Sequence, residues 1–208
     1  MSGSAALISQ MNPPPGENDE SDAWYVEGYM PLLMAVPGFL SAARGRAVRG
    51  EPSRLVVYYL DSRNALGNSE YQKVNNPSPL TKRMLNSIPA STRYLGDNIS
   101  DTGTTEPGKY LYLVTFEVLE DFLVEFDAWY EKEHLPLLMS SLAWTRCRRY
   151  SVVDSEPGGV TRAALHELAD LSALDSSERA KARATPWRTR LTRNRWFSSA
   201  RYAVYERF

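Results

Sequence analysis

The sequence predicts an α+β fold in which two tandem ferredoxin-like repeats, each with the order β-α-β-β-α-β, close one barrel with a pseudo-two-fold axis. Three observations lead to this prediction. Asp22–Tyr25 and Asp127–Tyr130 are the same tetrapeptide, Asp-Ala-Trp-Tyr. Pro31–Met34 and Pro136–Met139 are also identical, and both pairs are separated by 105 positions, which indicates a duplicated domain. Each half then alternates strand and helix signals in the order of a split β-α-β unit.

The repeat continues to the end of each half. Residues 55–61 match 164–170, and Arg93-Tyr94 matches Arg201-Tyr202. The separation drifts between 107 and 109 positions, so the insertions are small and are expected in loops. Two such sheets would close a barrel with the helices outside, and what is elsewhere a two-fold dimer becomes one chain.

The first repeat is expected to span residues 1–95. Short apolar or β-branched runs bounded by turn residues predict its strands, at 5–11, 43–48, 54–60 and 91–95. A helix is expected from an acidic start near Ser21 to Met34, where Val36–Gly38 ends it. A second helix is predicted over 65–87, with a break at the Pro-rich stretch 75–79.

Residues 96–108 are polar, contain Gly103, Pro107 and Gly108, and are predicted to link the halves. The second repeat then covers 109–208. Its strands are expected at 109–118, 146–153, 163–168 and 201–208, and its helices at 119–140 and 172–195, with a break near Pro186. In the first of these strands the alternation places one set of residues on a single face: Tyr110, Tyr112, Val114, Phe116 and Val118.

Composition excludes several classes of function. The 208 residues carry a net charge of −1, which argues against a nucleic-acid surface. The arginines between 179 and 195 are read as a solvated helix face, with contact to an anion or a partner as the alternative. The single Cys147 excludes an intrachain disulfide, and with two histidines no metal site is expected. No run approaches a membrane span and no leader is evident, so a cytoplasmic protein that does not bind membranes is predicted.

The stretch Asp127–Pro136 resembles the signature of the EthD-like family, which reads W-Y-x-x-E-H-x-P. Val36–Phe39, Arg149-Tyr150 and Thr185–Arg190 resemble further motifs of the tandem members common in filamentous fungi. The resemblance covers nearly the whole chain and implies a dimeric α/β barrel. Its members include cofactor-free polyketide decarboxylases and cyclases, an accessory protein of ether degradation and proteins without assigned activity.

The two copies differ at the candidate catalytic position. His134 of the second copy aligns with Tyr29 of the first, whose Val26–Tyr29 lacks the Glu-His pair, so the first site is expected to be degenerate. The helical stripe of Leu123, Phe126, Tyr130, His134 and Leu137 should turn His134 toward the sheet. A neutral imidazole in an apolar pocket can take up a proton. The alternative is a histidine that only packs and binds a backbone carbonyl near Pro136.

Tyr29 and His166 complete the candidate catalytic set. A buried phenol such as Tyr29 can donate a hydrogen bond to a carbonyl or enolate oxygen, or it can simply be a core tyrosine. His166 lies on a strand beside Glu167, and alternation places the two on opposite faces, so they form no dyad. Glu133 either orients an imidazole or lies at a rim, and Asp22 and Asp127 are expected to face solvent or cap their helices.

Several aromatic residues and one arginine form the expected binding set. Arg149 could hold a carboxylate or phenolate, or form a surface ion pair. The aromatic side chains either fill the core or line a pocket for a flat apolar ligand. The substrate-binding candidates are Trp24, Tyr25, Phe39, Trp129, Tyr130, Trp144, Arg149 and Trp187.

These observations predict a cofactor-independent lyase or cyclase of secondary metabolism. The expected substrate is a polyketide-like or other apolar carbonyl metabolite; His134 would move a proton and Tyr29 or Arg149 would polarise the carbonyl. The chain would act as a monomer with pseudo-dimer symmetry or as a homodimer. A non-catalytic small-molecule-binding or accessory protein is the alternative, and a haem-binding relative or an interaction protein are further ones.

Overall fold

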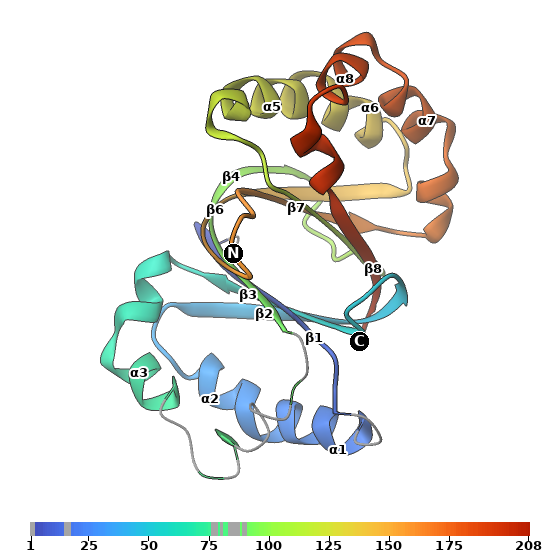
Figure 1. Cartoon of the computed structure of the whole chain (residues 1–208). Helices are drawn as coiled ribbons and strands as arrows, with labels where there is room; N and C mark the ends of the chain where they lie inside the picture. The colour runs from blue at the N-terminus through green and yellow to red at the C-terminus, as the bar shows by residue number, and fades with distance from the viewer. Residues whose placement is uncertain (1–2, 15–17, 76–78, 80, 83–87, 89–90) are drawn as a thin grey trace.

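A computed structural model shows one closed eight-stranded antiparallel barrel with helices at two opposite sides (Figure 1). It describes residues 3–14, 18–75, 79, 81–82, 88 and 91–208. Around the barrel the strands follow the order β1-β3-β2-β8-β5-β7-β6-β4. Each repeat contributes four neighbouring strands, β4-β1-β3-β2 and β8-β5-β7-β6, so the predicted tandem α+β barrel is confirmed.

The first repeat begins with a strand whose bounds match the prediction. Its helical layer is one continuous segment, α1 (Asn18–Ala23), a π-helical turn (Trp24–Tyr29) and α2 (Met30–Met34). After β3 come a 3-10 turn (Arg63–Gly67) and α3 (Ser69–Asn75). The strands are β1 (Ala5–Met11), β2 (Phe39–Arg49), β3 (Arg54–Leu60) and β4 (Thr92–Gly103). Most of the predicted helix beyond residue 75 lies outside the described residues.

The second repeat follows the same plan. Its first helical segment joins a 3-10 turn (Glu120–Phe122), α5 (Leu123–Trp129), a π-helical turn (Tyr130–His134) and α6 (Leu135–Met139). The second breaks before Pro186, as predicted. It contains a 3-10 turn (Leu171–Asp175), α7 (Ser177–Arg183), α8 (Pro186–Leu191) and a 3-10 turn (Arg195–Ser199). The strands are β5 (Tyr110–Phe116), β6 (Trp144–Glu156), β7 (Arg162–Leu168) and β8 (Arg201–Arg207).

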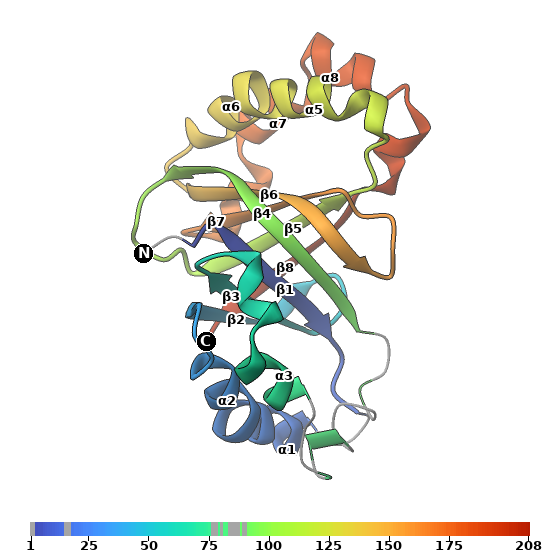
Figure 2. The ribbon, with the colours of Figure 1, turned by 90° about the vertical axis from the view of Figure 1, so that its left-hand side faces the viewer.

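Three apolar layers hold the molecule together. The barrel interior is filled by side chains from both repeats, including Ile8, Val57, Leu113 and Tyr205. On the outer face of the sheet, α5 to α8 cover one set of strands and α1 to α3 cover the opposite set (Figure 2). The strands are therefore buried on both faces, and β5 presents Leu111 and Leu113 to the interior while its alternate residues meet the helices.

The two repeats join through β2 with β8 and β4 with β6. The backbone of β2 passes close to β8 at Gly45, where a Cβ atom would lie 2.5 Å from the Cβ of Tyr205. The sequence predicts a linker over residues 96–108, but only its end is one. Strand β4 continues to Gly103, because residues 96–103 pair with β6. Only the residues between Gly103 and Tyr110 connect the halves.

The strand pairing also corrects the alignment of the repeats. Ala5 pairs with Leu60, and the equivalent Tyr110 pairs with Leu168. Leu60 therefore corresponds to Leu168, a separation of 108 rather than the 109 inferred for this stretch. A one-residue slip exchanges the two faces of a strand, so the counterpart of His166 is Tyr58 and not Val57.

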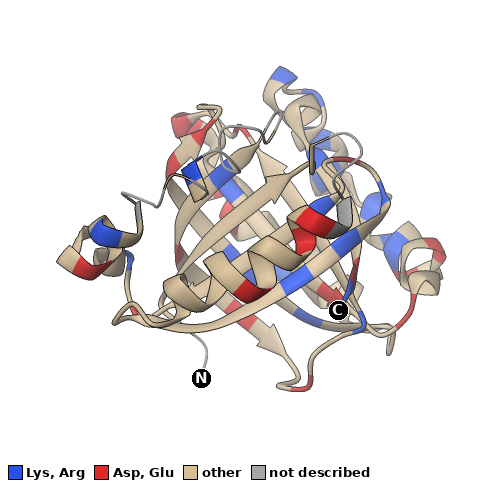
Figure 3. Cartoon of the chain, turned by 90° about the horizontal axis from the view of Figure 1, so that it is seen from below, with Lys and Arg blue, Asp and Glu red and all other residues tan. Residues whose placement is uncertain are grey.

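Charges are mixed over the surface. Figure 3, seen from the side of α1 and α2, shows acidic and basic residues interspersed among the described residues that it draws. In the described part of the chain no helix has the length and apolar character needed to cross a membrane.

Candidate functional site

A cavity of about 140 Å³ lies between the helices of the second repeat and the outer face of its sheet. Aromatic and aliphatic side chains form most of its wall. His134, His166 and three arginines are the polar exceptions. The full lining is Tyr112, Val114, Phe116, Trp129, Tyr130, His134, Leu138, Trp144, His166, Arg179, Arg183, Arg188, Phe197, Ala200 and Tyr202.

His134 is held at the cavity by a π-helical turn. Pro136 has no N–H, and its ring would press on the carbonyl four residues earlier in a regular α-helix. The turn is widened instead, and Leu135 N–H donates to the Tyr130 carbonyl. The ring of His134 stacks on Trp129 at 4.6 Å and meets Tyr130 edge to face at 5.0 Å. The prediction that His134 points toward the sheet is confirmed.

His166 reaches the same cavity from β7. Its Nε2 lies 2.8 Å from Tyr130 Oη, and Tyr112 stacks on its ring at 5.6 Å. Glu167 points the other way, into the barrel, as alternation predicts. Tyr130 therefore lies between the two histidines, with an edge contact to His134 and a hydrogen bond to His166.

Both histidines are neutral at physiological pH. Burial lowers the pKa of His134 to about 4; contact with the Ala182 backbone raises it, while the charges of Arg188, Arg149 and Arg179 lower it. Burial lowers the pKa of His166 to about 3, with a further contribution from His134. The Nδ1 atoms of both rings are buried and have no hydrogen-bond partner among the described residues. One nitrogen of each ring therefore has its hydrogen-bonding capacity unused within the described part of the protein.

The first repeat preserves this geometry with different chemistry. Tyr25 Oη lies 2.8 Å from Tyr58 Oη, in the place of the Tyr130–His166 pair. Tyr29 stacks on Trp24 at 5.5 Å in the place of His134. Burial raises the pKa of Tyr29 to about 12, so this phenol is no base. The predicted cooperation of Tyr29 with His134 is wrong, because the two lie in separate helical layers on opposite sides of the barrel (Figure 1).

The structure divides the predicted binding residues between the two repeats. Trp129, Tyr130 and Trp144 line the cavity beside His134. Trp187 lies outside it and donates its indole N–H to Glu125 at 3.2 Å. The remaining aromatics, Trp24, Tyr25 and Phe39, belong to the core under the first-repeat helices.

Arg149 is bound to carboxylates and does not line the cavity. Its guanidinium donates to Asp127 at 2.5 Å and to Glu131 at 2.6 Å, and it lies over the Tyr130 ring at 4.4 Å. Arg149 is absent from the cavity wall, so the structure does not support a ligand-binding role. The ion pair, which was the alternative, is present, although the Arg149 side chain is only 2% exposed while Asp127 and Glu131 are 28% and 36% exposed. Arg149 instead packs on the face of the Tyr130 ring and helps to hold this side chain in place.

Asp127 and Asp22 were expected to face solvent or cap helices, and this is also wrong. Asp127 accepts hydrogen bonds from Arg149 and Arg162, and Asp22 pairs with their counterparts Arg44 and Arg54. Each cluster ties the helix of one repeat to strands of its own sheet. The repeated tetrapeptide that contains the aspartate thus encodes a structural ion pair.

Part of the cavity wall carries no clear signal in the sequence. Phe197 and Ala200 come from the turn before β8, for which the sequence offered no signal. Arg179, Arg183 and Arg188 come from α7 and α8, and the only signal was the basic stretch between 179 and 195. Among the residues that the structure describes, no three His, Cys, Asp or Glu side chains lie together as a metal site would require. The cavity volume of about 140 Å³ lies below the roughly 300–1,000 Å³ that is typical of pockets for drug-sized ligands.

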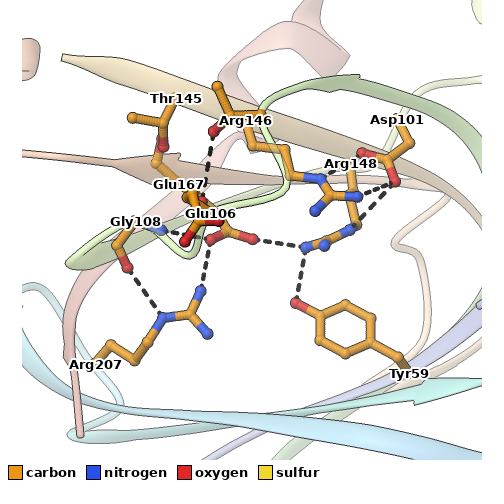
Figure 4. A network of polar contacts seen from close by, with 10 residues as sticks. Tyr59, Asp101, Glu106, Gly108, Thr145, Arg146, Arg148, Glu167 and Arg207 are labelled. Atoms are coloured by element: carbon orange, nitrogen blue, oxygen red, sulfur yellow. Dashed lines mark hydrogen bonds and ion pairs between the residues drawn. The ribbon is translucent and has the colours of Figure 1, made fainter. Parts of the chain in front are cut away.

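The inner face of the barrel carries a separate polar network (Figure 4). The buried Glu167 carboxylate accepts hydrogen bonds from Arg148 at 2.7 Å, Arg207 at 2.7 Å and the Gly108 N–H at 2.8 Å. Arg148 also donates to Tyr59 Oη at 3.1 Å. These bonds connect β3 with β6, β7 and β8, so the network fastens the two repeats to each other.

No protein-family model matches this sequence, and no curated protein sequence does. Solved structures match over the whole chain. An anthrone oxidase-like protein has a TM-score of 0.70 at 10% identity, covering 98% of this chain and 91% of its own. A chlorite dismutase mutant from Candidatus Nitrospira defluvii has a TM-score of 0.64 at 10% identity, and the match covers 97% of this chain and 90% of that protein. A Lactobacillus acidophilus protein assigned to the monooxygenases has a TM-score of 0.62 at 11% identity, and the match covers 98% of this chain and 93% of that protein. At this identity the likeness establishes the shared barrel fold, while the EthD-like resemblance stays a prediction.

Proposed function

We propose that the second repeat is a cofactor-independent active site that moves a proton on a carbonyl-containing, aromatic or polyketide-like metabolite, as a lyase or cyclase. The observation that carries the proposal is the pair of neutral histidines in the wall of an otherwise aromatic cavity. Neutral imidazoles are proton acceptors, and burial beside aromatic rings suits a flat substrate. A cavity of about 140 Å³ admits one ring of such a substrate.

In the proposed reaction His134 removes a proton from the carbon next to the carbonyl group. The electron pair of the broken C–H bond moves onto the carbonyl oxygen and gives an enolate. A base with a pKa near 4 is weak in the empty site, but a negative charge forming beside it raises the pKa of the imidazole. The enolate carbon then attacks a second carbonyl carbon of the substrate and closes a ring, or the enolate expels a β-hydroxyl group, which leaves as water with the proton that His134 took up. In a decarboxylation no proton is removed first: the bond to the carboxylate breaks, carbon dioxide leaves, and the resulting enolate takes up a proton at carbon.

Tyr130 and His166 form the second half of the proposed machinery. Their 2.8 Å hydrogen bond joins two groups that can each give and accept a proton. The pair can therefore stabilise the substrate oxygen with a hydrogen bond, or pass a proton to it and take that proton back when the product forms. In this proposal Tyr130 and His166 act on the carbonyl oxygen, the role that the sequence predicts for Tyr29 or Arg149.

The name of one structural neighbour favours a second candidate. It is described as an anthrone oxidase-like protein, and anthrone is an aromatic ketone. Proton removal by His134 would be the same first step, after which the carbanion would react with dioxygen instead of rearranging. Oxygen consumption separates this candidate from a lyase or cyclase.

Comparison of metabolite extracts tests the proposal. The gene is deleted and complemented with the wild type, His134→Gln or Tyr29→Phe, and the extracts are compared by mass spectrometry. We expect one compound to accumulate in the deletion and in His134→Gln, and to disappear with wild type and Tyr29→Phe. Its mass difference from the missing product identifies the reaction. Full rescue by His134→Gln would refute a catalytic role for this histidine.

A further inference from the structure

We propose that Arg179, Arg183 and Arg188 form an anion-binding subsite of this cavity, and that its ligand is an aryl carboxylate. This inference deepens the proposed function and rests on the same cavity, but it makes a claim about binding that holds whether or not His134 is catalytic. It is carried by three observations: these arginines have no carboxylate partner among the described residues, the aligned positions of the first repeat are not basic, and the cavity has the size of one aromatic ring.

The three arginines have no carboxylate within 4.0 Å among the residues that the structure describes. Arg179 donates to the Leu174 carbonyl, and Arg188 donates to the Arg183 carbonyl at 3.1 Å. This differs from the buried arginines elsewhere in the molecule, where Arg148 and Arg149 are each bound to carboxylates. Like charges close together repel, and in the described part of the chain no carboxylate offsets the charge of these three arginines.

These arginines converge on one place from two helices. Arg179 and Arg183 lie four residues apart on α7, and Arg188 lies in α8, across the break before Pro186. All three line the cavity that contains both histidines. Burial together with the charges of Arg183 and Arg179 lowers the pKa of Arg188, as expected where a positive charge lacks a partner.

The first repeat has other residue types at the three positions that align with these arginines. The repeat alignment places Tyr71, Asn75 and Thr81 at the positions of Arg179, Arg183 and Arg188. None of these residues is basic. At these three positions basic residues occur only in the repeat that also has His134 and His166, which favours a role in the chemistry of the site over a role in the stability of the fold.

The wall of the cavity selects the rest of the ligand. A cavity of 150 Å³ lined by apolar side chains binds benzene, so about 140 Å³ accommodates one aromatic ring. The planar guanidinium groups of arginine bind a carboxylate with two parallel hydrogen bonds. A flat ring with a carboxylate matches both features. A second cavity of about 120 Å³ shares Tyr112, Arg179 and Tyr202 with the first and gives room for a larger ring system.

Binding of such an acid also prepares His134. The charges of Arg188 and Arg179 lower the pKa of this histidine. Burial is the main cause of the lowered pKa of His134, and it stays in place when a ligand binds. A carboxylate bound between these arginines offsets their smaller contribution, so the pKa of His134 rises by that part. The anion subsite then couples recognition of the ligand to the strength of the base.

Calorimetric titration tests this inference with salicylate as the probe and salicylamide as its uncharged counterpart. We expect salicylate to bind more tightly than salicylamide, and Arg188→Gln to weaken salicylate binding about 10- to 100-fold, the range for loss of a charged hydrogen bond. Arg190→Gln is the matched control, because Arg190 lies on the same helix but pairs with Glu125. This control should bind as the wild type does. If Arg188→Gln fails to fold, Arg183→Gln is used instead, because Arg183 is exposed and its replacement should disturb the fold less.

The outcomes separate this inference from the proposed function. Equal binding of salicylate and salicylamide, no binding of salicylate, or an undiminished affinity in Arg188→Gln would each overturn the anion subsite. Inorganic phosphate that displaces salicylate at equal concentration would also overturn it, because the site would then bind any anion. His134→Gln should keep salicylate binding, so a failure of catalysis in that variant leaves the subsite intact.

Discussion

Replacing Asp127 by asparagine should destabilise the protein by about 2–3 kcal/mol. The substitution keeps the size of the side chain and removes its charge. Arg149, whose side chain is 2% exposed, loses one of its two carboxylates, and Arg162 loses its acidic partner. Removing one member of a buried ion pair costs about 3–5 kcal/mol, and the 28% exposure of Asp127 lowers that figure through solvent screening.

The repeat supplies a matched comparison. Asp22→Asn removes the equivalent charge from Arg44 and Arg54, so a loss of similar size is expected. For a chain of 208 residues, 1 kcal/mol corresponds to about 2–4 °C, and each variant should melt about 5–10 °C below the wild type. Urea unfolding followed by circular dichroism gives the free energies directly. Losses below about 0.5 kcal/mol in both variants would refute the reasoning.

The pH dependence provides an independent check. Burial raises the pKa of Asp127, but the hydrogen bonds from Arg162 and the charge of Arg149 outweigh it and hold the pKa below its ordinary value. A carboxylate with a lowered folded-state pKa stabilises the fold above its unfolded pKa, near 4, and the contribution is lost as the pH falls through the folded value. The wild type and Asp127→Asn should therefore converge in stability in strong acid.

Three further predictions concern the site and the barrel. His134→Gln should lower turnover about 10²- to 10⁴-fold in a steady-state assay with the identified substrate, with little change in melting temperature, because it removes only the base; an unchanged rate would exclude general base catalysis. The folded-state pKa values of His134 and His166 lie near 4 and 3, so the unfolded chain takes up protons at a higher pH than the folded protein does. The free energy of unfolding should therefore fall as the pH drops from about 6.5 toward 4. In melting curves recorded over this range, His166→Gln should show a smaller decrease of melting temperature with pH. Gly45→Ala should destabilise by about 1–3 kcal/mol in urea unfolding, because its Cβ would lie 2.5 Å from the Tyr205 Cβ; a loss near zero would show that the strands can separate there.

Sequence alone predicts the architecture well, because the duplication places strand and helix signals twice in the same order. His134 was also found, since helical spacing fixes which face a side chain occupies. The cavity as a whole was not predictable. Trp144, His166 and Arg188 approach one another only through strand register and the angle between α7 and α8, which are tertiary properties. The misplacement of Tyr29 has the same origin: equivalent positions in two repeats lie far apart once the barrel closes.

The two repeats are joined through pairing of their edge strands, and this affects which residues of the candidate site can be substituted independently. In a dimer of identical subunits each substitution appears in both sites, so symmetry couples their chemistry. Here the pairing of β2 with β8 and of β4 with β6 keeps both halves necessary, yet each helical layer has its own sequence. The first half can therefore lose a histidine or three arginines without altering the second, while substitutions at the strand edges are restricted in both. Asymmetry of function is compatible with this barrel because the parts that join the halves are not the parts that carry the chemistry.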